Sequence, residues 1–173
     1  MGSNSNTDGS GQAPAKGGRR PQFTWYSIAW KELGTKEFVG IADNPRVVEY
    51  HSTTTLRATD DEVPWCSSFV NWCMSKAGYT PTRSAAARSW NRWGVEIQTP
   101  IEGCIAVLTR TGGGHVGFVV RVEPGLVHLL GGNQDDAVNV KVYPASRVIS
   151  YRMPASLNSI DGQILSDIQH GAK

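Results

Sequence analysis

The chain has 173 residues, 39% of them hydrophobic, which is enough for one domain with a packed core and leaves little for a second. Its 17 basic and 15 acidic residues give a net charge of +2, which gives no reason to expect a nucleic-acid partner. No run approaches the roughly 18 apolar residues of a membrane span.

The two end segments differ from the middle in composition. Residues 1–22 are mostly Gly, Ser, Asn and Pro, so we predict a flexible N-terminal tail followed by one domain over residues 23–154. In residues 155–173 the apolar side chains fall at near-helical spacing, at Ile160, Ile164, Leu165 and Ile168. This spacing predicts a marginal amphipathic helix that either packs on its own domain or docks on a partner.

Two helices are predicted in the first third of the domain. The first starts at Phe23 and is ended by Gly34, and its apolar stripe consists of Trp25, Ile28, Ala29 and Leu33. The second is opened by Asn44-Pro45 and ends near His51. The acidic residues at 60–62 lack the spacing and the glycine of a calcium loop, so we interpret them as favourable charge before the next helix.

The next predicted helix carries Cys66 in its first turn. It is opened by Pro64, ended by Gly78, and presents an apolar stripe of Phe69, Val70, Cys73, Met74 and Ala77. A helix N-terminus favours a thiolate and lowers its pKa, as a nucleophile requires. A lone cysteine is more often a small core residue, so Cys66 needs support from elsewhere.

A further short helix is predicted over residues 84–93, with Trp90 and Trp93 on one face, either packed on the core or stacked on a ligand. Beyond Pro100 the periodicity changes to that of strands. We predict five of them, over residues 104–109, 115–122, 126–130, 137–143 and 147–152. Helices followed by strands indicate the α+β class, and the short turns predict that strands pair in sequence order.

His115 is the second candidate for chemistry. It opens an apolar strand between glycines, and in regular alternation it shares a face with Gly117, which leaves room for a substrate. Imidazole is the usual base for a thiol, so His115 and Cys66 together indicate a catalytic pair where the helix meets the sheet. A third polar group should orient the ring; Asn133 is preferred over His128, since an amide can accept a hydrogen bond at any working pH.

Three motifs carry a family resemblance. They are Pro64-Trp65-Cys66-Ser67-Ser68-Phe69-Val70, Gly114-His115-Val116-Gly117-Phe118-Val119 and Leu130-Gly131-Gly132-Asn133-Gln134. Their order over residues 23–154 resembles the papain-like peptidoglycan amidohydrolases of the CHAP and NlpC types, in particular a phage-associated branch. The resemblance implies a fold in which N-terminal helices pack on a five- to six-stranded antiparallel sheet.

The resemblance also implies roles for individual residues. Cys66 falls on the nucleophile and His115 on the base, with an oxyanion held by backbone N–H groups at the helix start. The CHAP pattern has a glutamate two residues before its asparagine; here that position is Gly131 while Asn133 is kept. The third member is therefore Asn133 or, in its place, His128, Glu62 or Gln134. The residues expected to line the substrate cleft are Trp65, Asn44, Tyr50, Trp90 and Gln134.

The implied activity is hydrolysis of an amide or peptide bond of bacterial murein, by an N-acetylmuramoyl-L-alanine amidase or an endopeptidase that needs no metal or organic cofactor. The sequence does not begin with a secretion signal, so we expect synthesis in a reducing cytoplasm with three free thiols, then holin-dependent release or assembly into a virion. The tails would then dock on phage tail proteins. The alternatives are a catalytically silent virion or wall-binding module, and an acyltransferase or protein-directed protease on the same scaffold.

Overall fold

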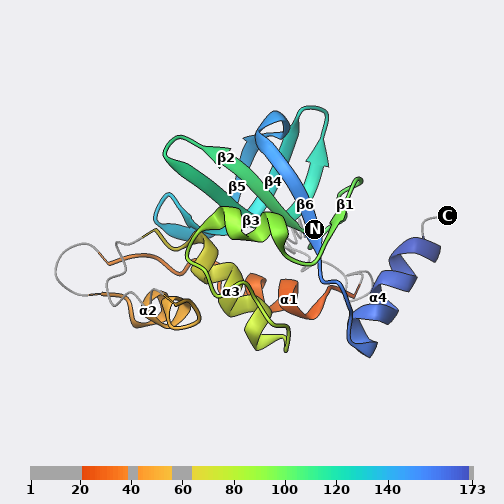
Figure 1. Ribbon diagram of the computed structural model, residues 1–173, viewed down its shortest axis with the longest axis horizontal. Coiled ribbons are helices and arrows are strands. Elements are labelled where there is room, and N and C mark those ends of the chain that lie inside the picture. The colour runs from red at the N-terminus through yellow and green to blue at the C-terminus, as the bar shows by residue number, and fades with distance from the viewer. Residues whose placement is uncertain (1–20, 39–42, 56–63, 172–173) are drawn as a thin grey trace, which may run out of the picture.

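The computed structural model describes residues 21–38, 43–55 and 64–171. A six-stranded antiparallel sheet forms one layer, and three helices lie together on one side of it (Figure 1). The helices are α1 (Thr24–Lys31), α2 (Pro45–His51) and α3 (Cys66–Lys76). The predicted α+β arrangement is therefore confirmed. The tail at 1–20 and the acidic residues at 60–62 lie outside the described residues.

The sheet has the strand order β1-β6-β2-β3-β4-β5. Its strands are β1 (Val95–Ile97), β2 (Ile105–Arg110), β3 (Gly113–Glu123), β4 (Leu126–Gln134), β5 (Ala137–Pro144) and β6 (Val148–Met153). All five predicted strands are present, and β2 to β5 pair in sequence order as expected. The added strand, β1, is only three residues long and offers no readable alternation.

The predicted pairing is wrong for β6. After the short 3-10 helix η2 (Ala145–Arg147) the chain leaves β5, and β6 pairs with β2 on one side and β1 on the other. The reason lies in β2, whose residues 105–108 are all buried. A strand buried on both faces belongs inside a sheet, so β2 needs a second neighbour besides β3.

The first helix is held by a residue from the far end of the domain. Asp161 of α4 (Ser159–His170) is fully buried and accepts hydrogen bonds from the backbone N–H and hydroxyl of Thr24, at 2.7 Å each, and from Tyr79. The helix predicted in the C-terminal segment is thus present, and its first turn packs on its own domain. The apolar stripe predicted for α1 is wrong at Leu33. The helix ends at Lys31, and the Leu33 side chain is 52% exposed.

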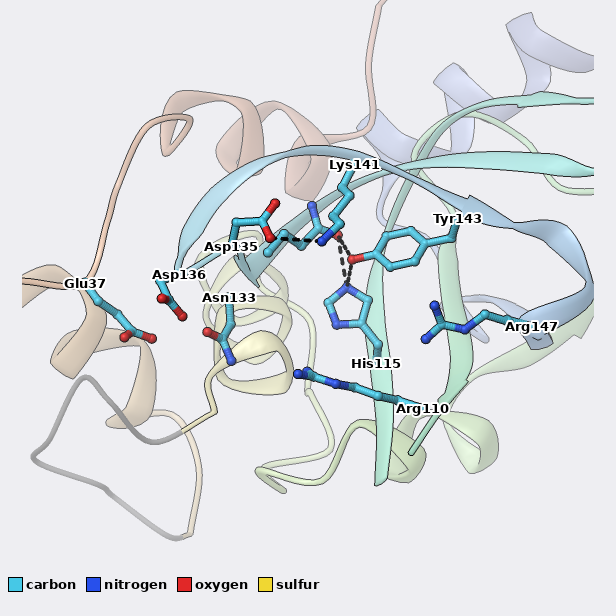
Figure 2. A pocket seen from close by; sticks show the side chains of 10 residues that line it. Glu37, Arg110, His115, Asn133, Asp135, Asp136, Lys141, Tyr143 and Arg147 are labelled. Carbon is cyan, nitrogen blue, oxygen red and sulfur yellow. Dashed lines mark hydrogen bonds and ion pairs between the residues drawn. The ribbon is translucent and has the colours of Figure 1, made fainter. Parts of the chain in front are cut away.

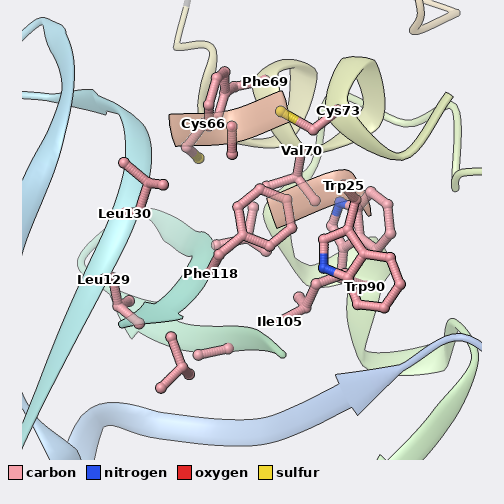
Figure 3. Close-up of a cluster of buried hydrophobic side chains, with 14 of the residues drawn as sticks. Trp25, Cys66, Phe69, Val70, Cys73, Trp90, Ile105, Phe118, Leu129 and Leu130 are labelled. Carbon is pink, nitrogen blue, oxygen red and sulfur yellow. The ribbon is translucent and has the colours of Figure 1, made fainter. Parts of the chain in front are cut away.

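Helix α3 passes through the centre of the core. Every residue from Cys66 to Met74 is buried, and the Phe69 ring meets Phe118 of β3 edge to face at 6.3 Å (Figure 3). A Cβ on Gly132 would lie 2.6 Å from the ring of Trp65 and 2.8 Å from Cβ of Phe69. The glycine therefore allows the start of α3 to approach β4 closely.

The helix predicted over residues 84–93 is smaller than expected, since only the 3-10 helix η1 (Ala87–Arg92) forms there. Its Trp90 ring is buried in the core cluster (Figure 3) and meets the Trp93 ring edge to face at 5.0 Å. Of the two interpretations of Trp90, core packing is the correct one. Among the described helices, none has both the length and the apolar character that crossing a membrane requires.

Candidate active site

Cys66 is the first residue of α3, where the helix leaves its first backbone N–H groups without intrahelical partners. The residue is 6% exposed. Burial raises the pKa of the Cys66 thiol, and the backbone N–H groups of Val116 and Ser67 and the charge of Arg110 only partly oppose that rise. The lowered pKa expected from the sequence is therefore wrong, because desolvation outweighs the helix terminus. At neutral pH the group is a thiol.

His115 lies near the start of β3 and is only 2% exposed. Its Nε2 is 3.0 Å from Oε1 of Gln134 and 3.2 Å from the hydroxyl of Tyr143, whose ring lies 5.2 Å from the imidazole (Figure 2). Burial lowers the pKa of His115 to about 4, and the charges of Arg110, Arg147 and Lys141 act in the same direction. The imidazole is therefore neutral at neutral pH.

The hydrogen bonds of Gln134 determine which nitrogen of His115 carries the proton. The Gln134 amide Nε2 donates to the backbone oxygens of Leu129 and Asn139 and to the Asn139 side chain, at 3.1, 2.8 and 3.0 Å. All three partners are acceptors, so the amide oxygen must be the atom that faces His115. An oxygen here accepts a hydrogen bond from Nε2–H, so the ring proton is on Nε2, and Nδ1 is unprotonated and available as a base.

The backbone around Gln134 directs its side chain to the imidazole of His115. The pairing of β4 with β5 shifts register between Gly131 and Gln134, and Asn133 adopts a left-handed φ of 53°. The Gln134 side chain then turns back over Gly131, where an added Cβ would lie 2.8 Å from its Oε1. Gln134 is 1% exposed. It is a buried amide with all its polar atoms engaged, which fixes its orientation.

Cys66 and His115 share their neighbours. Val116, whose backbone N–H acts on the Cys66 thiol, directly follows His115. Burial raises the pKa of Tyr143 to about 12, with Cys66 as the next cause, and the Tyr143 hydroxyl is also bonded to His115. Arg110 affects the pKa of both groups. The fold therefore brings the thiol and the imidazole to the same end of β3.

A polar cavity of about 440 Å³ opens beside His115 (Figure 2). Its charged lining residues are Glu37, Asp135 and Asp136 on the acidic side, and Arg110, Lys141 and Arg147 on the basic side. His115, Asn133, Gln134 and Tyr143 complete the lining. Sequence reasoning missed Tyr143, Arg110 and Arg147, because each comes from a strand end or a turn with no motif of its own.

Four residues expected to line the substrate cleft are not among those that line this cavity. Trp65, Tyr50 and Trp90 are each 0% exposed; their polar atoms donate to Glu37, Glu32 and Ser67. Asn44 is the N-cap of α2 and accepts a hydrogen bond from the backbone of Arg46. These contacts are structural, and buried rings offer no surface to a ligand. We therefore leave the four residues out of the site.

The candidates for the third group are also separated. Gln134 is bonded to His115, whereas Asn133 lines the cavity without a hydrogen bond to the imidazole among the described contacts. His128 pairs with Arg121 across the sheet and binds Glu123 at 3.0 Å, away from the cavity. Glu62 lies outside the described residues. Within the described ranges, no group of three or more His, Cys, Asp or Glu side chains is placed to hold a metal ion.

Comparison with protein-family models finds a similarity over part of the chain. A family model described as CHAP domain matches residues 58–133. The CHAP match contains Cys66 and His115 and ends one residue before Gln134. No curated protein matches the chain. Helices on a six-stranded antiparallel sheet agree with the papain-like CHAP fold, which confirms the predicted fold class, and the match indicates an amidase or peptidase that acts on peptidoglycan.

Proposed function

We propose that this protein hydrolyses an amide bond of peptidoglycan by a cysteine–histidine mechanism, with Cys66 as nucleophile, His115 as base and Gln134 as the residue that positions the imidazole. The observation that carries the proposal is the hydrogen bond from His115 Nε2–H to Gln134 Oε1, at 3.0 Å. It leaves the unprotonated Nδ1 as the catalytic nitrogen. A catalytic imidazole held in one tautomer by a buried polar side chain is typical of nucleophilic hydrolases.

The reaction would follow from these groups in two stages. His115 Nδ1 takes the proton of the Cys66 thiol as the sulfur attacks the carbonyl carbon of the amide. Backbone N–H groups at the start of α3, including that of Cys66, would stabilise the oxyanion. The protonated Nδ1 then donates its proton to the leaving amine, which leaves a thioester. Water, deprotonated by the same nitrogen, hydrolyses the thioester to a carboxylate and restores the thiol.

Both groups are neutral in the resting protein, since burial raises the pKa of Cys66 and lowers that of His115. The proton would thus move only when a substrate is bound, in contrast to a preformed thiolate–imidazolium pair. A neutral amide partner fits this arrangement. A carboxylate in place of the Gln134 amide would favour the imidazolium and raise the pKa of His115.

Gln134 also accounts for the missing glutamate of the CHAP pattern. Because residue 131 is glycine, the space in which its side chain would begin holds the Gln134 amide. A glutamate at position 131 would contact the imidazole of His115. Gln134, three residues further along the chain, would make that contact instead. This assignment replaces Asn133, which the sequence favoured.

The resemblance of the three motifs to a phage-associated branch supports a phage origin, with action either at lysis after holin-dependent release or from a virion. On that proposal the N- and C-terminal tails, residues 1–22 and 155–173, would contact phage tail proteins. One observation favours a second candidate, a catalytically silent wall-binding module: Cys66 is 6% exposed and its pKa is raised.

Clearing of purified bacterial cell-wall sacculi separates the two candidates. We expect the wild-type protein to clear them and Cys66→Ala to be at least about a thousandfold slower, because a nucleophile has no substitute. Cys104→Ala is the matched control, since Cys104 is a buried thiol whose charge acts on Tyr151, whereas that of Cys66 acts on Tyr143, which is bonded to His115. The masses of the released products identify the bond. Equal clearing by wild type and Cys66→Ala would refute the mechanism, and binding of sacculi without clearing would identify the silent module.

A further inference from the structure

The cavity beside His115 has a separated charge distribution. The acidic side chains Glu37 and Asp136 lie at one end, and Arg110 and Arg147 lie at the other, with His115 between them (Figure 2). Lys141 is neutralised by Asp135, at 3.0 Å. Among the described residues, neither Arg110 nor Arg147 forms an ion pair with a carboxylate. Within the described ranges, two positive charges therefore face the cavity without a carboxylate paired to either of them.

The fold fixes both arginines close to the base. In the pairing of β2 with β3, Leu108 lies opposite His115 and Arg110 opposite Gly113, so Arg110 is on the same face as His115, two positions along the neighbouring strand. Arg147 of η2 donates from Nε and one Nη to the backbone oxygen of Thr109, at 3.1 and 2.8 Å. Thr109 directly precedes Arg110, so the Arg147 guanidinium is bound next to the residue that carries the other arginine side chain.

Arg147 is held before any ligand arrives. Besides its bonds to Thr109, its guanidinium lies 5.4 Å from the centre of the Tyr143 ring, and Tyr143 itself is bonded to His115. The carbonyl of Thr109 carries only a partial charge and does not cancel the cation. A guanidinium with one edge held by the backbone still offers N–H donors to a ligand, and a planar anion is its preferred partner.

From this arrangement we infer that Arg110 and Arg147 form a subsite for a free carboxylate of the murein stem peptide, next to the amide bond that is cleaved. The inference rests on the proposed function. Stem peptides carry free carboxylates, whereas the hydroxyl and N-acetyl groups of the glycan are neutral. The cavity thus selects the peptide part of murein, with the carboxylate at the arginine end and an amine, where present, at the end formed by Glu37 and Asp136.

The subsite would also connect substrate binding to the chemistry. The charges of Arg110 and Arg147 help to keep the pKa of His115 low in the free protein. A carboxylate bound between them opposes their field and raises that pKa, which makes the imidazole a stronger base only when a substrate is present. An amide of the same shape would fill the subsite without this effect.

Binding to the Cys66→Ala protein tests the subsite independently of turnover. The probes are three forms of one disaccharide-tripeptide muropeptide: with both carboxylates free, with the D-glutamate α-carboxylate as its amide, and with the C-terminal carboxylate as its amide. By calorimetry we expect at least one amide form to bind about tenfold or more weakly than the free form, as for loss of a charge-assisted pair. The form that loses affinity shows which carboxylate is bound. Equal affinity for all three forms would overturn the subsite.

Variants of the arginines complete the test. Arg110→Gln in the Cys66→Ala background should remove most of the preference for the free carboxylate, so that the free and amide forms bind with similar affinity. Arg121→Gln is the control, because Arg121 is exposed, pairs with Glu123 and does not line the cavity. A preference that survives Arg110→Gln and the double variant with Arg147→Gln would also overturn the subsite. Wild-type protein that clears sacculi without any carboxylate preference would refute the subsite alone; a preference without clearing would refute hydrolysis alone.

Discussion

His115 and Cys66 lie at the same end of β3 in different surroundings. The imidazole is bonded to Gln134 and Tyr143, and the amide of Gln134 is bonded in turn to Leu129 and Asn139. The thiol begins an entirely buried stretch of α3, and the groups that favour its ionisation are backbone N–H groups and the charge of Arg110. The sheet thus orients the base through polar contacts, while the helix desolvates the nucleophile through packing. The predictions below test each side of this comparison.

The largest effect should come from the polar side. Gln134→Ala removes the acceptor that holds Nε2–H, so Nδ1 is no longer fixed as the base, and we expect kcat to fall about a hundredfold. Gln134→Glu should restore part of the rate and move the acid limb of the pH profile to higher pH, because a carboxylate raises the pKa of His115. Rates on sacculi between pH 4 and 8 measure both effects. A loss of rate with no shift of the profile in Gln134→Glu would mean that the residue is only structural.

The stability of the protein should fall in acid because His115 is buried neutral. Its pKa is about 4 in the folded protein and near 6.5 when unfolded, so the unfolded state binds a proton first as the pH falls. The contribution of neutral His115 to stability is lost as the pH falls from 6.5 to 4. We expect it to lower the free energy of unfolding by about 2 kcal/mol between pH 7 and 4.5. Denaturant unfolding of wild type and His115→Gln at the two pH values measures it. An equal drop in both proteins would contradict the assignment.

The apolar side can be tested at the contact between α3 and β4. Gly132→Ala places a methyl group 2.6 Å from the Trp65 ring, so the start of α3 must move, and we expect a loss of about 1 to 3 kcal/mol of stability and a lower kcat. Gly113→Ala is the control, because nothing lies within 4 Å of its Cβ position. Thermal unfolding and rates on sacculi report the two effects. Unchanged activity in Gly132→Ala would show that the position of α3 is not critical.

The smallest effect should come from Asn133. Asn133→Gly keeps the left-handed backbone, whose φ is 53°, and removes a side chain that forms no hydrogen bond with the imidazole among the described contacts, so kcat should change less than about twofold. Steady-state rates on sacculi, compared with those of Gln134→Ala, measure the difference. A loss as large as that of Gln134→Ala would return Asn133 to the role that the sequence favoured for it.

The sequence predicts the elements well and their connections less well. Strand periodicity located β2 to β6, and the capping residues Asn44 and Pro45 located α2, because these signals are local. The pairing of β6 with β2 follows from the burial of β2, which needs a neighbouring strand on each side. The lengths of the turns do not show this. The choice between Asn133 and Gln134 depends on a register shift and a left-handed residue, and regular alternation contains no information on either.

The pKa of Cys66 shows a further limit of sequence reasoning. The pattern of α3 correctly places Cys66 in the first turn, where the helix favours a thiolate. The burial of the Cys66 thiol depends on the close approach of β4 at Gly132 and on the fold as a whole. That burial decides whether the pKa of Cys66 is raised or lowered. Arg110 and Arg147 were overlooked for a similar reason, since only the path of η2 brings the second arginine to Thr109.

The buried carboxylate of Asp161 also has a consequence for engineering. By accepting two hydrogen bonds from Thr24, it joins the start of α1 to the first turn of α4. None of the residues that line the cavity belongs to α1 or α4. A targeting module fused ahead of Thr24 or behind His170 would therefore emerge from a surface that shares no residue with the cavity, which makes either end a suitable attachment point for redirecting the protein to a chosen cell wall.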